Sequence, residues 1–195
     1  MAPTLHGFHF VRHGQTLDNL RGVRCGGDRD APLTDRGIAD ARAAAERFRR
    51  SGRPCGLVIA GPLRRTAVTG ALFAEALGVL LVEQTWLRER ALGEWNGLPI
   101  AMTRPWFAEG LPPPGGEAEE EFAARVLAGV ADLSGLLDQR PLLVGSKGIG
   151  RVLLHRLAGQ PAVELENCEI VAFERRSEAS PNEPYPWRCD RVVPG

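Results

Sequence analysis

The chain has 195 residues, 44% of them hydrophobic, and a single domain over residues 1–195 is the expectation for this length. Lys and Arg number 24, as do Asp and Glu, so the zero net charge gives no electrostatic reason to expect binding to nucleic acid or to an anionic membrane. No run reaches the roughly 18 apolar residues of a membrane span, and no signal-peptide pattern is visible, so we expect a soluble, cytoplasmic protein.

The first half of the chain alternates short apolar runs with stretches of helical periodicity. Residues 8–11 are predicted to form the first strand. Thr34 is a suitable N-cap for a helix whose apolar face repeats every three or four residues, at Ile38, Ala41, Ala45 and Phe48. Residues 56–60 then predict a second strand, residues 62–78 a helix opened by Pro and closed by Gly, and residues 79–82 a third strand.

The second half continues the alternation after a stretch from 86 to 116 that is rich in Gly, Pro and Trp and has no clear helical pattern. An acidic run at 117–121 opens the next helix, favourably placed against the helix dipole. The buried stripe of that helix is expected to be Phe122, Val126, Val130, Leu133 and Leu137. Residues 141–145 predict a fourth strand, which leads through 146–148 into a helix. Two terminal strands are expected at residues 170–173 and 187–193.

This order of elements predicts the α/β class: a single three-layer α/β/α domain with a mostly parallel central sheet. In such sheets ligands bind beyond the carboxyl ends of the strands. Residues 12–14, 61–65 and 146–148 each follow a predicted strand, so these three loops are expected to meet at one pocket although they are far apart in the sequence.

His13 ends the first apolar run, between Arg12 and Gly14. This combination suits a phosphate, because arginine donates bidentate charge-assisted hydrogen bonds and a neutral histidine can attack phosphorus. The glycine is expected to let a ligand approach closely. Arg64 and Arg65 open a predicted helix, where their positive charges are unfavourable beside the positive end of the helix dipole. An anion bound at the same terminus would relieve this repulsion.

The segment Arg12-His13-Gly14-Gln15-Thr16, followed by Asn19, resembles the signature of the histidine phosphatase (phosphoglycerate mutase-like) superfamily. Further segments resemble the family in the same order, at residues 26–37, 61–69, 87–97 and 115–117. The resemblance extends from about Phe8 to about Leu154, and it implies a phosphoglycerate mutase-like fold and phosphoryl transfer.

The resemblance also implies a role for individual residues. His13 would be the nucleophile that forms a phosphohistidine, Arg12 and Arg65 would hold the phosphate, and Glu89 would be the general acid and base. The remaining phosphate- or substrate-binding candidates are Thr16, Asn19, Gly26, Ser146 and Lys147. Glu94 is the competing carboxylate, but the spacing favours Glu89.

One segment departs from the family pattern. Aligned on Gly148 and Arg151, the family's second histidine is Ser146 in this chain. That histidine normally donates a hydrogen bond to the transferring phosphoryl group. Either Ser146 and Lys147, the only lysine, replace the lost donor, or the pocket binds phosphate and turns over slowly.

The expected function is therefore hydrolysis of a small phosphomonoester, with a small phosphorylated metabolite as the partner. No metal or cofactor is expected, because the arginines supply the positive charge. A non-catalytic domain that binds a phospho-ligand, and a phosphoglycerate mutase-type isomerase, are the alternatives. The short chain between Gly97 and Gly116 favours a phosphatase over a mutase, since mutases usually carry a longer insertion over the site. The Gly145-x-x-Gly148-x-Gly150 spacing is wrong for a dinucleotide fingerprint.

Overall fold

The computed structural model describes residues 6–161, 164–175 and 185–192, and its strands form one sheet in the order β3-β2-β4-β1-β5-β6. The strands are β1 (Gly7–Arg12), β2 (Leu57–Ala60), β3 (Leu80–Glu83), β4 (Leu142–Gly145), β5 (Ile170–Arg175) and β6 (Trp187–Arg191). Strands β1 to β4 pair in parallel, whereas β5 pairs antiparallel with β1 and β6 antiparallel with β5. The predicted mostly parallel α/β sheet is confirmed.

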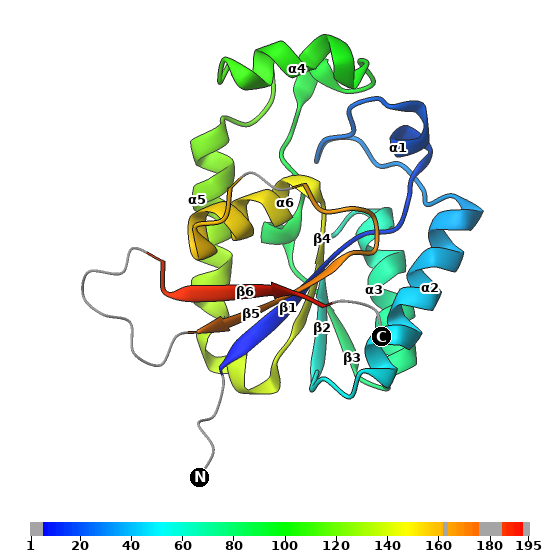
Figure 1. Ribbon diagram of the computed structural model, residues 1–195. Coiled ribbons are helices and arrows are strands. Elements are labelled where there is room, and N and C mark those ends of the chain that lie inside the picture. The colour runs from blue at the N-terminus through cyan, green and yellow to red at the C-terminus, as the bar shows by residue number, and fades with distance from the viewer. Residues whose placement is uncertain (1–5, 162–163, 176–184, 193–195) are drawn as a thin grey trace.

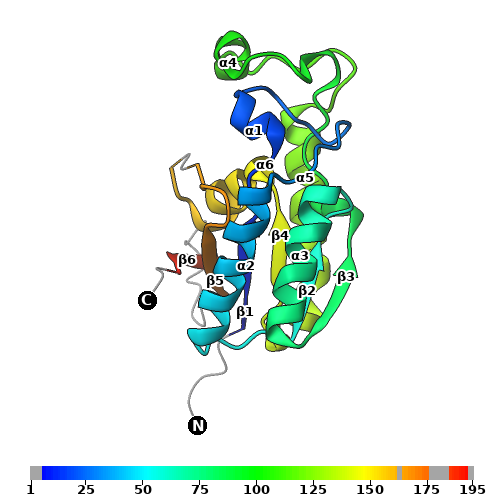
Figure 2. The ribbon, with the colours of Figure 1, turned by 90° about the vertical axis from the view of Figure 1, so that its right-hand side faces the viewer.

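Helices cover both faces of the sheet (Figures 1 and 2). The α-helices are α1 (Leu17–Arg21), α2 (Asp35–Arg50), α3 (Arg64–Leu77), α4 (Ile100–Ala108), α5 (Glu119–Ala131) and α6 (Lys147–Val152). Helices α2 and α3 pack side by side on one face, and α5 and α6 lie on the other. The short helices α1 and α4 lie beyond the carboxyl ends of the parallel strands, at the top of Figure 1. None of the described helices combines the length and apolar character needed to cross a membrane.

Two cores form because the side chains of each strand alternate between the faces. Leu142 and Val144 of β4 pack in the core under α2 and α3, whereas Leu143 packs in the core under α5. The central strands β1, β2 and β4 are buried along their whole length, as expected for parallel strands covered on both faces. Strand β3, at the edge of the sheet, is exposed throughout.

Several local predictions are confirmed by the caps of the helices. The Thr34 side chain accepts a hydrogen bond from the Gly37 amide at 2.9 Å, and Gly78 ends α3 at φ 66°. The predicted helix through Leu137 ends instead at Ala131 and continues as a 3-10 helix over Asp132–Gln139, a stretch that contains the poor helix formers Ser134 and Gly135. Val193, the predicted end of the last strand, lies outside the described residues.

The stretch from 86 to 116 contains the short 3-10 helices Thr85–Leu87 and Gly93–Trp95, followed by α4. Although short, it places a helix over the end of the sheet (Figure 1). The loop that leads to Glu89 is fastened to α5, because Arg125 donates hydrogen bonds to the carbonyls of Trp86 and Arg88 at 2.8 and 3.0 Å. Gly129 of α5 lies directly under Trp86: a Cβ atom there would lie 2.1 Å from Cδ2 of the indole.

We therefore expect Gly129→Ala to lower the free energy of unfolding by about 1–3 kcal/mol, because the indole must move or the helix must shift. This loss opposes the gain of up to about 1 kcal/mol that alanine normally brings to a helix interior. Urea unfolding followed by tryptophan fluorescence measures the change. Gly135→Ala is the matched control, since no atom lies within 4 Å of its added methyl group. A Gly129→Ala protein as stable as the parent would contradict this packing.

Candidate active site

A cavity of about 390 Å³ opens at the carboxyl edge of the sheet and gathers most of the predicted site residues. Its lining includes Arg12, His13, Thr16, Asn19, Arg65, Glu89 and Lys147. These residues come from the end of β1 and the residue after it, from α1 and its N-cap, from the first turns of α3 and α6, and from the loop that contains Glu89. Two predicted site residues, Gly26 and Ser146, do not line the cavity.

His13 directly follows β1, and its side chain is buried. Its amide donates to the Gly145 carbonyl at 2.9 Å, which ties the loop to the end of β4. Nδ1 lies 2.7 Å from the carbonyl oxygen of Gly14. Because a carbonyl oxygen can only accept a hydrogen bond, Nδ1 carries the proton and Nε2 keeps its lone pair. Burial, then the charges of Arg65 and Arg12, hold the pKa of His13 well below 6.5, so the imidazole is neutral.

The role expected for Gly14 is corrected by its surroundings. A Cβ atom at this position would lie 2.4 Å from the carbonyl oxygen of Gly37, at the start of α2. The Gly14 amide donates to Oγ1 of Thr69 at 3.1 Å. The absence of a side chain at Gly14 therefore allows the loop to pack against the backbone of α2, rather than allowing a ligand to approach.

Arg65 lies in the first turn of α3 with 1% of its surface exposed, whereas the neighbouring Arg64 is exposed. The Arg65 guanidinium donates to the carbonyl oxygens of Arg29 at 2.9 Å and Gly26 at 3.1 Å. Gly26 is expected from the sequence to contact the ligand, but it contacts Arg65 instead. The carbonyl oxygen of Gly26 accepts a hydrogen bond from the guanidinium and so helps to orient it.

Arg12 ends β1 and is also buried, with 8% of its surface exposed. Its Nη1 donates to the Leu165 carbonyl at 2.6 Å, and its Nε is buried without a hydrogen-bond partner in the part of the chain that the structure describes. Both guanidiniums are held by neutral carbonyl oxygens and lie close enough to His13 to lower its pKa. Such an arrangement leaves an excess of positive charge at the bottom of the cavity, which is what an oxyanion requires.

Glu89 is fixed by two backbone amides. Oε1 accepts from the Arg90 amide at 2.7 Å, and Oε2 accepts from the Gly148 amide at 2.8 Å. A Cβ atom on Gly148 would lie 2.1 Å from Oε1 of Glu89, so a glycine is needed there for this contact. Each oxygen keeps a lone pair for a second partner, so the carboxyl group can exchange a proton with a bound molecule. Glu94, the competing carboxylate, is exposed and does not line the cavity.

Thr16 and Asn19 build the start of α1 as a capping box. The Thr16 hydroxyl accepts from the Asn19 amide at 3.1 Å, and Oδ1 of Asn19 accepts from the Thr16 amide at 3.2 Å. Oδ1 of Asn19 also lies 3.3 Å from Nδ2 of Asn167, which donates to the His13 carbonyl at 2.8 Å. The Asn19 oxygen is thus used within the protein, which leaves its NH₂ group as the donor available to a ligand in the cavity.

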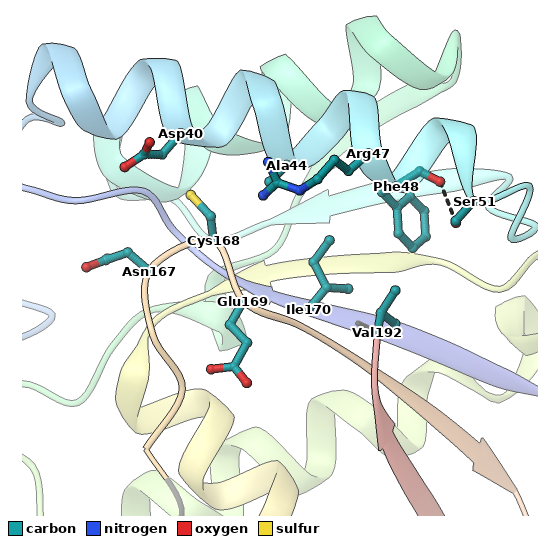
Figure 3. Close-up of a pocket in the computed structure, with 10 residues that line it drawn as sticks. All are labelled: Asp40, Ala44, Arg47, Phe48, Ser51, Asn167, Cys168, Glu169, Ile170 and Val192. Atoms are coloured by element: carbon teal, nitrogen blue, oxygen red, sulfur yellow. Dashed lines mark hydrogen bonds between the residues drawn. The ribbon is translucent and has the colours of Figure 1, made fainter. Parts of the chain in front are cut away.

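Sequence reasoning missed the segment around Asn167. The Cys168 amide donates to the Arg12 carbonyl, and the Arg12 amide donates to the Glu169 carbonyl, so this segment continues the pairing of β1 beyond β5. Figure 3 shows Asn167, Cys168 and Glu169, which line a second hollow of about 280 Å³ beside α2; Asn167 also lines the main cavity. No local pattern marks these residues, because their role depends on strand pairing across more than 150 positions.

Ser146 and Lys147 do not offer the donors that their sequence position suggests. Ser146 is buried and does not line the cavity, and among the described residues its Oγ has no hydrogen-bond partner. Lys147 lines the cavity, but its Nζ lies 2.5 Å from Oε2 of Glu164. Within the described residues, no cluster of three or more His, Cys, Asp or Glu side chains could hold a metal ion.

A family model described as the histidine phosphatase superfamily (branch 1) matches residues 8–180. The chain belongs to this superfamily. The chain is 33% identical over 178 residues to the probable phosphoglycerate mutase GpmB of Yersinia pestis, a match that covers 83% of this chain and 81% of the relative.

Solved structures of the histidine phosphatase fold agree with this assignment. A mycobacterial glucosyl-3-phosphoglycerate phosphatase matches with a TM-score of 0.80 and 27% identity, over 96% of this chain and 98% of that one. A second structure, described as mycobacterial hydrolase 1, matches with a TM-score of 0.80 and 26% identity, over 98% and 99% of the two chains. The expected phosphoglycerate mutase-like relationship and fold are confirmed.

In this member of the superfamily, we expect His13 to remain a neutral Nδ1–H imidazole from pH 8 to well below pH 6.5, because burial and two arginines disfavour its charged form. Long-range ¹H–¹⁵N NMR of the imidazole nitrogens reports both the tautomer and the titration. Arg65→Gln should raise the pKa of His13, since Arg65 is the larger of the two charge effects. His9, which burial and then Arg140 shift to a pKa of about 4, is an internal comparison. Protonation of His13 near pH 6.5 would contradict the geometry.

Proposed function

We propose that this protein hydrolyses a small phosphomonoester through a phosphohistidine on Nε2 of His13. The observation that carries the proposal is the buried neutral imidazole, oriented by the Gly14 carbonyl and flanked by two arginines that no carboxylate neutralises at hydrogen-bond distance in the described chain. Such a group is a ready nucleophile toward an electrophile that carries negative charge.

Two displacements complete the reaction. In the first, the lone pair of Nε2 forms a bond to phosphorus, the ester P–O bond breaks, and the departing oxygen takes a proton from the Glu89 carboxyl group. In the second, Glu89 takes a proton from water, the oxygen of that water bonds to phosphorus, and the P–N bond breaks to release inorganic phosphate and free His13. Arg12 and Arg65 stabilise the charge on the phosphoryl oxygens throughout, with Asn19 as a neutral donor, so that the reaction needs no metal ion.

The relatives support hydrolysis and leave one alternative. A solved relative that matches with a TM-score of 0.79 and 28% identity is a glucosyl-3-phosphoglycerate phosphatase in complex with VO₃. The relative GpmB is named as a probable mutase, so a mutase-type transfer is the second candidate function. The two differ in what accepts the phosphoryl group: water in a phosphatase, a hydroxyl of the bound substrate in a mutase.

We expect His13→Ala to lower the turnover of p-nitrophenyl phosphate by about 10³-fold or more and to eliminate an acid-labile phosphoenzyme, because the attacking nitrogen is gone. Rapid quench with ³²P-labelled substrate measures both. Glu89→Gln should keep the phosphoenzyme but slow the first step with alkyl esters by about 10²–10⁴-fold, while nitrophenolate, which needs no proton to leave, is affected much less.

His9→Gln is the control for removing a buried histidine, since His9 lies in β1 away from the cavity lining. Full turnover by His13→Ala would place the chemistry elsewhere. Transfer of the label to a second position of the substrate, faster than its release as phosphate, would favour the mutase.

Ser146 is proposed to take the place of the superfamily's second histidine, as its alignment with the family pattern indicates. The residue directly follows β4, and its small side chain does not reach the cavity lining. With Lys147 paired to Glu164, the site lacks one donor to the phosphoryl oxygens. Losing one such donor typically slows a reaction by about 10²–10³-fold. This chain would then be a slow phosphatase or, in the alternative, a domain that only binds a phospho-ligand.

Accordingly, Ser146→His should raise turnover of simple phosphomonoesters by about 10–100-fold, and Ser146→Leu, of similar bulk but without a donor, should not. Lys147→Ala should change the rate little if Glu164 holds the ammonium group away from the substrate. Steady-state kinetics and thermal unfolding of each variant separate catalysis from stability. A natural protein that binds vanadate without turnover, and gains turnover with Ser146→His, would establish the binding-domain alternative. A fast natural enzyme that Ser146→His slows would contradict the missing-donor interpretation.

A further inference from the structure

Arg24 lies on the wall of the same cavity, on the side covered by α4, and the mechanism above does not use it. Its Nε donates to Oγ1 of Thr103 at 2.7 Å, and its Cζ lies 4.1 Å from the centroid of the Phe107 ring. Thr103 and Phe107 both belong to α4, so this helix orients the guanidinium through a hydrogen bond to its Nε and through a cation–π contact with its planar face. In the described residues the two Nη groups of Arg24 have no hydrogen-bond partner.

Three other cations that line the cavity are paired with carboxylates, whereas Arg12 and Arg65 are held by carbonyl oxygens. Arg90 and Arg151 both pair with Glu119, at 2.5 and 2.9 Å, and Lys147 pairs with Glu164. Arg24 has no carboxylate within ion-pair distance among the described residues. Burial is the main cause that lowers the pKa of Arg24; the charge of Glu164 opposes it, and the charges of Arg151 and Arg104 lower the pKa further. On this side of the cavity Arg90 and Arg151 share the carboxylate of Glu119, and Arg24 forms no ion pair among the described residues, which leaves a positive charge beside the Phe107 ring.

We propose that Arg24, oriented by Thr103 and Phe107, binds a second anionic group of the substrate, a carboxylate or a phosphate, while the scissile phosphate lies against His13. This inference rests on the proposed function and narrows its substrate class to phosphomonoesters that carry a second negative charge. The planar fork of an arginine with two free nitrogens matches the two oxygens of either group. Val23, Ile100 and Phe107 line the cavity beside Arg24 and supply apolar contact for the part of the substrate that joins its two charges.

The acidic residues that line the cavity do not pair with Arg24 in the described chain. Glu89 is held by the amides of Arg90 and Gly148, and Glu164 is paired with Lys147. Glu166 lines the cavity, and its charge is the largest of those that raise the pKa of Arg12. Among the described residues, the charge of Glu166 acts on Arg12 at the end of β1, and Glu166 forms no ion pair with Arg24. A substrate with a positively charged substituent would have to use Glu166 and leave Arg24 unpaired.

The test compares the affinities of phosphonates that the enzyme cannot hydrolyse, measured by isothermal titration calorimetry. The probes are phenylphosphonate, 4-carboxyphenylphosphonate, 1,4-phenylenediphosphonate and 4-(aminomethyl)phenylphosphonate. A charge-assisted contact with Arg24 should make the carboxylate or the diphosphonate bind about 10–100-fold more tightly than phenylphosphonate. Whichever anionic probe binds more tightly identifies which of the two groups the site takes.

Arg24→Gln should reduce that affinity ratio to about one, and Arg24→Lys should retain only part of it, since a lysine keeps the charge but loses the fork. Arg104→Gln is the matched control: it removes the same charge from an exposed position of α4 outside the cavity lining, and the ratio should persist. Thermal unfolding of each variant checks that α4 remains in place.

Equal affinities in the natural protein, tighter binding of the aminomethyl probe, or an unchanged ratio in Arg24→Gln would each overturn the inference. Because binding of phosphonates needs no turnover, these outcomes are independent of whether His13 performs hydrolysis. Conversely, His13-dependent turnover of p-nitrophenyl phosphate with equal phosphonate affinities would keep the proposed function and reject the role of Arg24.

Discussion

The site depends on one constraint: two buried guanidiniums are held by backbone carbonyl oxygens rather than by carboxylates. Arg12 donates to the Leu165 carbonyl, and Arg65 donates to the carbonyls of Gly26 and Arg29. A carboxylate partner would cancel the charge of each arginine. A carbonyl satisfies the hydrogen bond and leaves the charge in place, so the bottom of the cavity stays positive and His13 stays neutral. The same contacts thus favour both the proposed nucleophile and the proposed phosphate site.

Burying two like charges is unfavourable, and the rest of the fold provides the stability that permits it. The parallel strands β1, β2 and β4 are packed on both faces by apolar side chains, and they bring the ends of three separate segments to one edge. The Leu165 carbonyl, on the segment before β5, is placed by the antiparallel pairing of β5 with β1. The arginine side chains therefore meet carbonyls that the backbone already holds at the right place, and little side-chain freedom is left to lose on binding a ligand.

How much of this the sequence could predict depends on whether the decisive contact is local. The strand that ends at His13, the cap at Thr34 and the convergence of loops at the carboxyl edge follow from periodicity and from the rules of parallel sheets. The roles of Gly14 and Gly26 could not be predicted, because they depend on the backbone of Gly37 and on the guanidinium of Arg65, which are distant in sequence. The same holds for the helix α4 and for Arg24: a stretch rich in Gly, Pro and Trp has no periodicity that would show which residue it covers.

The contact between Glu89 and Gly148 bears on what the residue at position 146 can change. The acid is oriented by a backbone amide of α6, and that amide is present whatever side chain occupies position 146. Only a side chain at 148 would displace the carboxylate. In the proposed mechanism the loop after β4 therefore has two separable tasks: its backbone positions Glu89, and a side chain can contribute a donor to the phosphoryl group. The donor loss that we propose at Ser146 would affect the second task and leave the contact between Glu89 and the Gly148 amide intact, so the geometry supports the proposal of a weakened phosphatase over that of a domain that only binds a ligand.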